Sequence, residues 1–145
     1  MKNITLDRFF MKRDSQYKSE LTPEITANAT ALLEKVNALL AELEDIGELK
    51  KDQDYMVSSG WRPPSFNKTV GNAAKKSLHM TGNAIDIMDN KLQTLAYTIK
   101  KNASLLKKYG LWMEDPDSTM GKFTNWCHLD NSTTRTDRNI RIFKP

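Results

Sequence analysis

The longest regular pattern in the chain is an apolar stripe with helical spacing between Pro23 and Gly47. Its members recur at intervals of three and four residues, which places them on one face of an α-helix. Thr22 offers a hydroxyl cap, Pro23 suits the first helical position, and Gly47 is a natural stop. We predict one long helix that packs on the core of its own domain, with a coiled-coil partner as the less favoured alternative. The stripe consists of Ile25, Ala29, Leu32, Leu33, Val36, Leu39, Leu40, Leu43 and Ile46.

Short runs with strand character occupy the second half of the chain. Residues 55–59 read as a strand that ends at Gly60, and residues 84–87 as a second strand. Ile85 and Ile87 share one face of that strand, so Asp86 lies on the other. The remaining predicted strands are 111–114 and 124–129, joined as a hairpin across 115–122, and an edge strand in the stretch 140–143.

Two helical segments and one long loop complete the prediction. Leu6, Phe9, Phe10 and Met11 suggest a short N-terminal turn or helix that docks on the core, and residues 90–109 read as a helix ended by Gly110. The segment 61–65 contains two consecutive prolines, which predicts irregular backbone within a loop of residues 60–80. A loop of that length inside a compact domain is usually functional.

Three side chains form a candidate metal site. His79 and Asp86 are seven residues apart, and His128 lies on a predicted strand. Two imidazoles and one carboxylate bind zinc with one coordination position left for water, which is the arrangement of a catalytic rather than a structural zinc. The alternative is that both histidines are ordinary core or surface residues.

The length, cysteine content and net charge of the chain limit the classes of protein to which it can belong. The 145 residues fit one domain, residues 1–145, and no apolar run is long enough to cross a membrane. The N-terminus has no extended apolar stretch, so we expect synthesis in a cytoplasm without a secretory signal. Cys127 is the only cysteine; strand alternation points it away from His128, so we expect a buried thiol. The net charge of +4 is spread thinly and forms no dense basic patch that would predict nucleic-acid binding.

Several segments carry a resemblance to a known family. The run Ser77-x-His79-x-x-Gly82-x-Ala84-x-Asp86 is similar to the zinc-ligand signature of the M15 peptidases, which include D-alanyl-D-alanine carboxypeptidases and L-alanyl-D-glutamate endopeptidases of bacteria and phages. Residues 57–64 resemble that family's Ser-Gly-Tyr-Arg segment, and residues 126–128 its Trp-x-His. The resemblance covers nearly the whole chain. It implies an α+β fold of the hedgehog/DD-peptidase kind, in which a small antiparallel sheet carries the zinc site and packs against helices.

The resemblance also raises a question about the general base. Many M15 relatives place an acid three residues before the last histidine ligand, but here that position is Asn125, which cannot take up a proton. Glu114 is the best substitute, because antiparallel pairing of its strand with the strand of His128 would bring the two together. Asp115 and Asp130 are weaker candidates.

Two further residues receive roles. Arg62 is the predicted substrate-binding residue, since a guanidinium can hold a carboxylate by two hydrogen bonds or stabilise an oxyanion. Ser77 is predicted to orient, by hydrogen bonding, the loop that carries His79, which we call the metal loop. Trp126 is expected to form a wall of the cleft.

The favoured interpretation is a zinc-dependent peptidase that cuts peptidoglycan stem peptides. We expect it to act as a monomer that neither binds nucleic acid nor inserts into a membrane. The missing signal fits a phage endolysin released by a holin, or a virion component. The first alternative is a cell-wall-binding module of the same fold, which Asn125 keeps open. The second is a basic nucleic-acid-binding domain, although no helix-turn-helix, zinc-finger or RNA-binding aromatic pattern is present.

Overall fold

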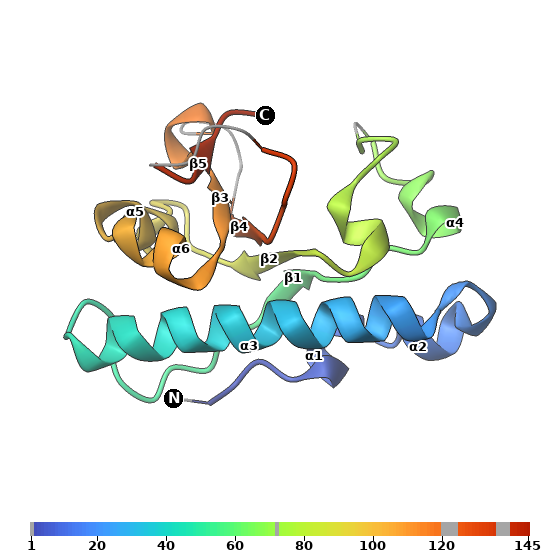
Figure 1. The fold of residues 1–145 in the computed structure, drawn as a ribbon, viewed down its shortest axis with the longest axis horizontal. Coiled ribbons are helices and arrows are strands. Elements are labelled where there is room, and N and C mark those ends of the chain that lie inside the picture. The colour runs from blue at the N-terminus through green and yellow to red at the C-terminus, as the bar shows by residue number, and fades with distance from the viewer. Residues whose placement is uncertain (1, 72, 120–124, 136–139) are drawn as a thin grey trace.

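This computed structural model describes residues 2–71, 73–119, 125–135 and 140–145. Its longest element is the helix α3 (Pro23–Asp45). The Thr22 hydroxyl accepts a hydrogen bond from the amide of Ile25 at 3.2 Å, and Pro23 occupies the first turn, as predicted. Figure 1 shows α3 running the length of the molecule, with the sheet on one side and the N-terminal segment on the other. Its buried face is the predicted stripe from Ala29 to Leu43.

Three short helical segments precede α3. They are α1 (Leu6–Phe10), α2 (Arg13–Gln16) and the 3₁₀-helix η1 (Lys18–Glu20). Phe9 and Phe10 of α1 are buried, which confirms that this segment docks on the core. Phe10 also meets the fully buried Trp61 edge-on, with ring centroids 6.0 Å apart. The N-terminal segment is therefore packed directly under the start of the long loop.

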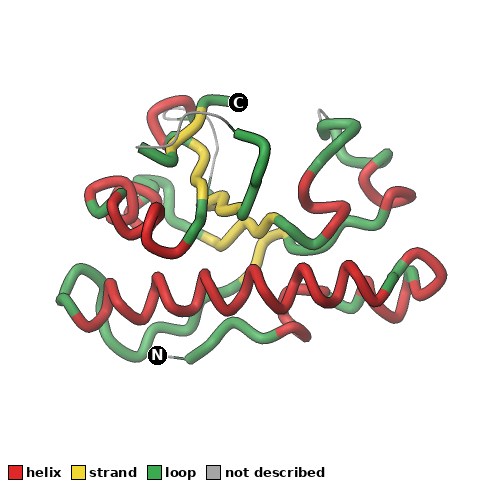
Figure 2. The backbone as a smooth tube through the Cα atoms, viewed as in Figure 1, coloured by secondary structure: helices red, strands yellow, loops and turns green. Residues whose placement is uncertain are grey.

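A five-stranded sheet lies across α3 in the order β1-β2-β4-β3-β5. Strands β1 to β4 pair antiparallel, as predicted, whereas β5 pairs parallel with β3. The α+β class is confirmed, and Figure 2 shows the yellow strands between the red helices. The strands are β1 (Val57–Ser59), β2 (Ala84–Met88), β3 (Trp112–Glu114), β4 (Trp126–Asp130) and β5 (Ile142–Phe143).

One hydrophobic cluster joins α1, α3 and the inner face of the sheet. Ile85 and Ile87 of β2 are fully buried in it, as the alternation predicted. Cys127 is also buried, at 1% exposure, and burial raises the pKa of its thiol well above the usual value. The prediction of a buried cysteine on the face opposite His128 is confirmed. None of the helices in the described segments is long and apolar enough to span a membrane.

The predicted helix over residues 90–109 is wrong in its extent, because the structure has two helices, α5 (Thr94–Lys101) and α6 (Ser104–Tyr109). The break falls at Asn102, whose side-chain amide donates to the carbonyl of Thr98. Asparagine competes in this way with backbone bonding and favours helix ends. The start is later than predicted because the carboxylate of Asp89 accepts from the amides of Leu95 and Ala96, while residues 90–93 form a turn.

The long loop is also more regular than predicted. Pro64 begins the short helix α4 (Pro64–Asn67), where a proline is tolerated because the first helical amide needs no partner. A 3₁₀-helix, η2 (Leu78–Thr81), carries His79. Between β3 and β4 another 3₁₀-helix, η3 (Pro116–Ser118), occupies part of the predicted hairpin connection. The rest of that connection, with Thr124 at the predicted strand start, lies outside the described residues.

Candidate metal centre and its cavity

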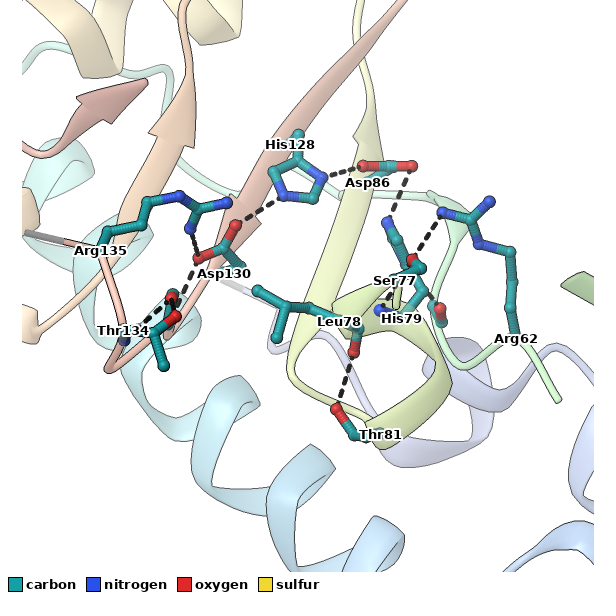
Figure 3. A network of polar contacts seen from close by, with 12 residues as sticks. Arg62, Ser77, Leu78, His79, Thr81, Asp86, His128, Asp130, Thr134 and Arg135 are labelled. Atoms are coloured by element: carbon teal, nitrogen blue, oxygen red, sulfur yellow. Dashed lines mark hydrogen bonds and ion pairs between the residues drawn. The ribbon is translucent and has the colours of Figure 1, made fainter. Parts of the chain in front are cut away.

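Three elements distant in the sequence bring His79, Asp86 and His128 together. Asp86 of β2 and His128 of β4 are partners in the antiparallel register, and η2 places His79 beside them. His79 Nε2 lies 3.3 Å from Asp86 Oδ2, and His128 Nδ1 lies 2.8 Å from Asp86 Oδ1 (Figure 3). The three ligand atoms all lie within 4.8 Å of one another, so this cluster could hold a metal ion. The donor set of two imidazole nitrogens and one carboxylate oxygen fits zinc.

The imidazole of His79 is oriented by a backbone carbonyl. Its Nδ1 atom lies 2.8 Å from the carbonyl oxygen of Gly60, so the tautomer with a proton on Nδ1 leaves the Nε2 lone pair facing Asp86. The Ser77 hydroxyl accepts from the amide of His79 at 3.2 Å and caps η2. Ser77 therefore acts on the backbone of the metal loop and not on the ring, which agrees with a role in orienting that loop.

Two glycines let the metal loop pack against neighbouring backbone. A Cβ at Gly60 would lie 2.0 Å from the carbonyl oxygen of Phe9, so β1 ends in direct backbone contact with α1. Gly82 ends η2 with φ +79°, and a Cβ there would lie 2.8 Å from the carbonyl oxygen of Ile25 in α3. The helices under the sheet thus fix the position of His79.

The imidazole of His128 is held by two carboxylates. Its Nε2 atom lies 2.8 Å from Asp130 Oδ2, which directs Nδ1 toward Asp86 (Figure 3). Asp130 is fully buried, and its other oxygen accepts from Arg135 at 2.5 Å and from the amide of Ser132 at 3.1 Å. A carboxylate behind a ligating histidine fixes the ring orientation and increases its basicity.

The electrostatics of the cluster favour a proton on His128 in the metal-free chain. Burial lowers the pKa of His128, but the hydrogen bonds with Asp130 and Asp86 outweigh burial and raise it to about 9. Burial raises the pKa of Asp86, yet its hydrogen bonds to His128 and His79 bring it well below the usual range. A cation is thus already stabilised here, and a metal ion would take the place of that proton.

The metal cluster opens into a cavity of about 790 Å³. All six residues predicted for the site line this cavity, and Trp126, 37% exposed, forms part of its wall as expected. The acidic side chains that line the cavity belong to the strands of the sheet, whereas most of the basic ones belong to helices and loops. The predicted residues are Arg62, Ser77, His79, Asp86, Glu114 and His128.

Glu114 is the carboxylate best placed to act as a base. Met113 pairs with Leu129 in the β3–β4 register, so one step further brings Glu114 level with His128. Asp115 is instead paired with Lys100 at 2.8 Å, and Asp130 is engaged by His128. Asn125 does not line the cavity among the described residues.

Arg62 is tied to the metal loop at both its backbone and its side chain. Its amide donates to the carbonyl of His79 at 3.0 Å, and its Nη2 atom lies 3.5 Å from the Ser77 hydroxyl (Figure 3). Burial lowers the pKa of Arg62, while nearby Asp86 opposes that shift. The guanidinium is therefore a positioned cation beside the candidate metal ligands.

Sequence reasoning missed several contacts of this site. The sequence identifies Asp130 as a candidate base and not as a partner of His128, although its position two residues after His128 on the same strand face is a signal for that contact. Arg135 and the Gly60 carbonyl gave no local signal, because their contacts depend on the path of the chain. No sequence motif includes Arg13, yet it lines the cavity.

Comparison with known protein families gives a match over most of the chain. The sequence model of the family described as Peptidase M15 matches residues 15–130, a stretch that contains all six predicted site residues. A comparison with curated proteins finds no match to this chain.

Proposed function

Because the chain belongs to the Peptidase M15 family of metal-dependent peptidases, we propose that it is a zinc enzyme that hydrolyses the stem peptides of peptidoglycan. The observation that carries the proposal is the convergence of His79, Asp86 and His128 in the lining of a cavity large enough for a peptide. The +4 net charge supports an anionic polymer as the substrate.

Each residue of the site has a separate role in the proposed hydrolysis. When bound, zinc supplies a Lewis acid that lowers the pKa of a coordinated water and polarises the scissile carbonyl. Glu114 accepts the proton of the attacking water and returns it to the departing amine. Arg62 binds a substrate carboxylate or the developing oxyanion. Gly60 and Asp130 hold the two imidazoles in their ligating orientations.

The proposal extends to where the protein acts. A phage or prophage lysis enzyme released by a holin, or a virion component, would bring this catalytic site to the cell wall. D-Ala-D-Ala and L-Ala-D-Glu bonds are both candidates for cleavage, since the same metal chemistry serves either one. Mass spectrometry of a peptidoglycan digest would identify the bond.

The decisive experiment removes and restores the metal. Purified peptidoglycan is incubated with the chelated protein and with the same sample after addition of zinc, and released peptides are quantified. We expect release only with zinc, and none with His128→Ala. Circular dichroism of His128→Ala shows whether it folds, and Glu114→Gln provides a variant that retains the metal ligands. Full activity of the chelated protein or of folded His128→Ala would refute the proposal.

One observation favours a second candidate function, a module that binds wall peptides without cutting them. The position that carries an acid in many M15 relatives is Asn125, so the catalytic proton transfer requires a carboxylate from elsewhere in the site, for which Glu114 is the best candidate. Glu114→Ala separates the two functions, because a binding module would keep its affinity for peptidoglycan and show no hydrolysis in any form.

A further inference from the structure

Two arginines stand on the same wall of the cavity. Arg62 follows β1, and Arg13 comes from α2, about fifty residues earlier in the chain. The Nη1 atom of Arg13 donates to the carbonyl of Trp61 at 2.9 Å, which fixes Arg13 next to Arg62. Its guanidinium carbon also lies 4.1 Å from the centroid of the Phe66 ring. Both arginines, together with Phe66, line the cavity that contains the candidate metal ligands.

Burial lowers the pKa of Arg62 and the charge of Asp86 raises it, but Asp86 lies beyond ion-pair distance of both arginines. No carboxylate among the described residues forms an ion pair with Arg13 or Arg62. Burial and, next, the charge of Arg62 lower the pKa of Arg13. Holding two cations side by side at a partly buried wall is unfavourable, and an anion bound between them or to each would relieve that cost.

We propose that Arg13 is a second carboxylate-binding residue, so that the cavity selects peptides with two negative charges, one bound by Arg62 and the other by Arg13. This inference rests on the proposed function and names the class of substrate within it. Arg13 precedes residue 15, where the family match begins, so the match does not extend to this residue.

The geometry of Arg13 suits that task. A guanidinium carries five N–H donors, and the bond to Trp61 uses one of its groups, which leaves others for a carboxylate. The contact with Phe66 restrains the side chain before substrate arrives, so less conformational entropy is lost on binding. Lys76 lines the same cavity and adds a further positive charge. Two acidic groups of the cavity, Asp86 and Asp130, are instead bonded to His128 on the sheet.

The test compares two stem peptides that are identical except that one carboxyl group is free in the first and amidated in the second. The zinc-loaded full chain is assayed for kcat/KM on each peptide, and the Glu114→Gln form is used to measure each Kd by calorimetry without turnover. Arg13→Gln is compared with Arg13→Lys and with Lys18→Gln, which removes an exposed charge from the neighbouring η1.

We expect the unmodified chain to prefer the free carboxyl by about tenfold or more, as a charge-assisted hydrogen bond provides. Arg13→Gln should lose that preference because it binds only the peptide with the free carboxyl more weakly. Arg13→Lys should keep part of the preference, and Lys18→Gln should keep all of it. Equal losses on both peptides, or an unchanged preference in Arg13→Gln, would overturn the inference.

The two measurements separate this inference from the proposed function. Binding with the expected preference but no cleavage would overturn the peptidase function and leave the role of Arg13 supported. Cleavage of both peptides at equal rates would support the peptidase function and overturn the role of Arg13. Failure to bind either peptide would contradict both.

Discussion

The Nε2 atom of His128 lies 2.8 Å from Oδ2 of Asp130, a carboxylate with no exposed surface. Because Nε2 is engaged in this way, Nδ1 is the atom that faces Asp86. Arg135 contacts the second oxygen of Asp130 and its guanidinium lies 3.6 Å from the centroid of Phe143 on β5. The orientation of a metal ligand is thus coupled to the edge of the sheet and to the segment that follows β4.

Asp130→Asn is the first test of that coupling. The amide keeps the shape of the side chain but removes the charge that makes the imidazole basic, and outer carboxylates of this kind contribute about 10–100-fold to metal affinity. We expect zinc affinity, measured by competition with a chromophoric chelator, to fall within that range. Asp45→Asn at the exposed C-terminal end of α3 is the control and should leave affinity unchanged. Equal affinities for Asp130→Asn and the unmodified chain would contradict the role of Asp130.

Gly60→Ala is the second test, because it acts on His79 through the backbone. The added methyl group would lie 2.0 Å from the carbonyl oxygen of Phe9, so β1 or α1 must move and the carbonyl that orients His79 moves with it. We expect a destabilisation on the order of 1–3 kcal/mol together with weaker zinc binding. Urea denaturation of the chelated chain and zinc titration measure the two effects.

A matched glycine provides the control for this substitution. Gly71→Ala adds the same methyl group where no atom lies within 4 Å, so stability and zinc affinity should stay close to those of the unmodified chain. Similar losses in both alanine variants would show that the close contact with Phe9 is not the cause.

Much of this site was predictable because short-range periodicity encodes it. Strand alternation places Asp86 on the face of β2 opposite that of Ile85 and Ile87. In the antiparallel register, Asp86 and His128 are partners. The capping signals around Thr22 and Pro23 defined the start of α3 for similar local reasons. The face of Asp86 and the start of α3 are thus encoded by neighbouring residues, whereas the pairing of β2 with β4 depends on the path of the chain.

Contacts that depend on the path of the chain were not predictable in this way. The apolar stripe of residues 90–109 continues across Asn102, so periodicity alone could not reveal the break between α5 and α6. Arg13 reaches the cavity only because α2 packs beside Trp61, and Arg135 because the chain turns back after β4. Parallel pairing of β5 with β3 has the same origin, since no hairpin specifies it.

The third prediction concerns pH. The pKa of His128 in the metal-free chain is about 9, against 6.5 for an unperturbed histidine, so the extra proton stabilises the metal-free fold below pH 6.5 and that stabilisation is lost as pH rises through 9. Zinc must displace this proton. We therefore expect apparent zinc affinity to rise by up to about tenfold per unit between pH 6 and 8. The same affinity at both pH values would show that no ligand proton is released.

The last prediction distinguishes two neighbouring carboxyl groups. Glu114 of β3 lines the cavity, whereas Asp115 is bonded to Lys100 and caps η3 through the amide of Asp117. Glu114→Gln should lower kcat by about 10²–10⁴-fold, the usual contribution of a general base, with zinc content unchanged. Asp115→Asn preserves the capping oxygen and should lower thermal stability while it changes kcat by less than about tenfold. Peptide release and metal content are measured on both variants. The opposite order of kcat losses would assign the proton transfer to Asp115.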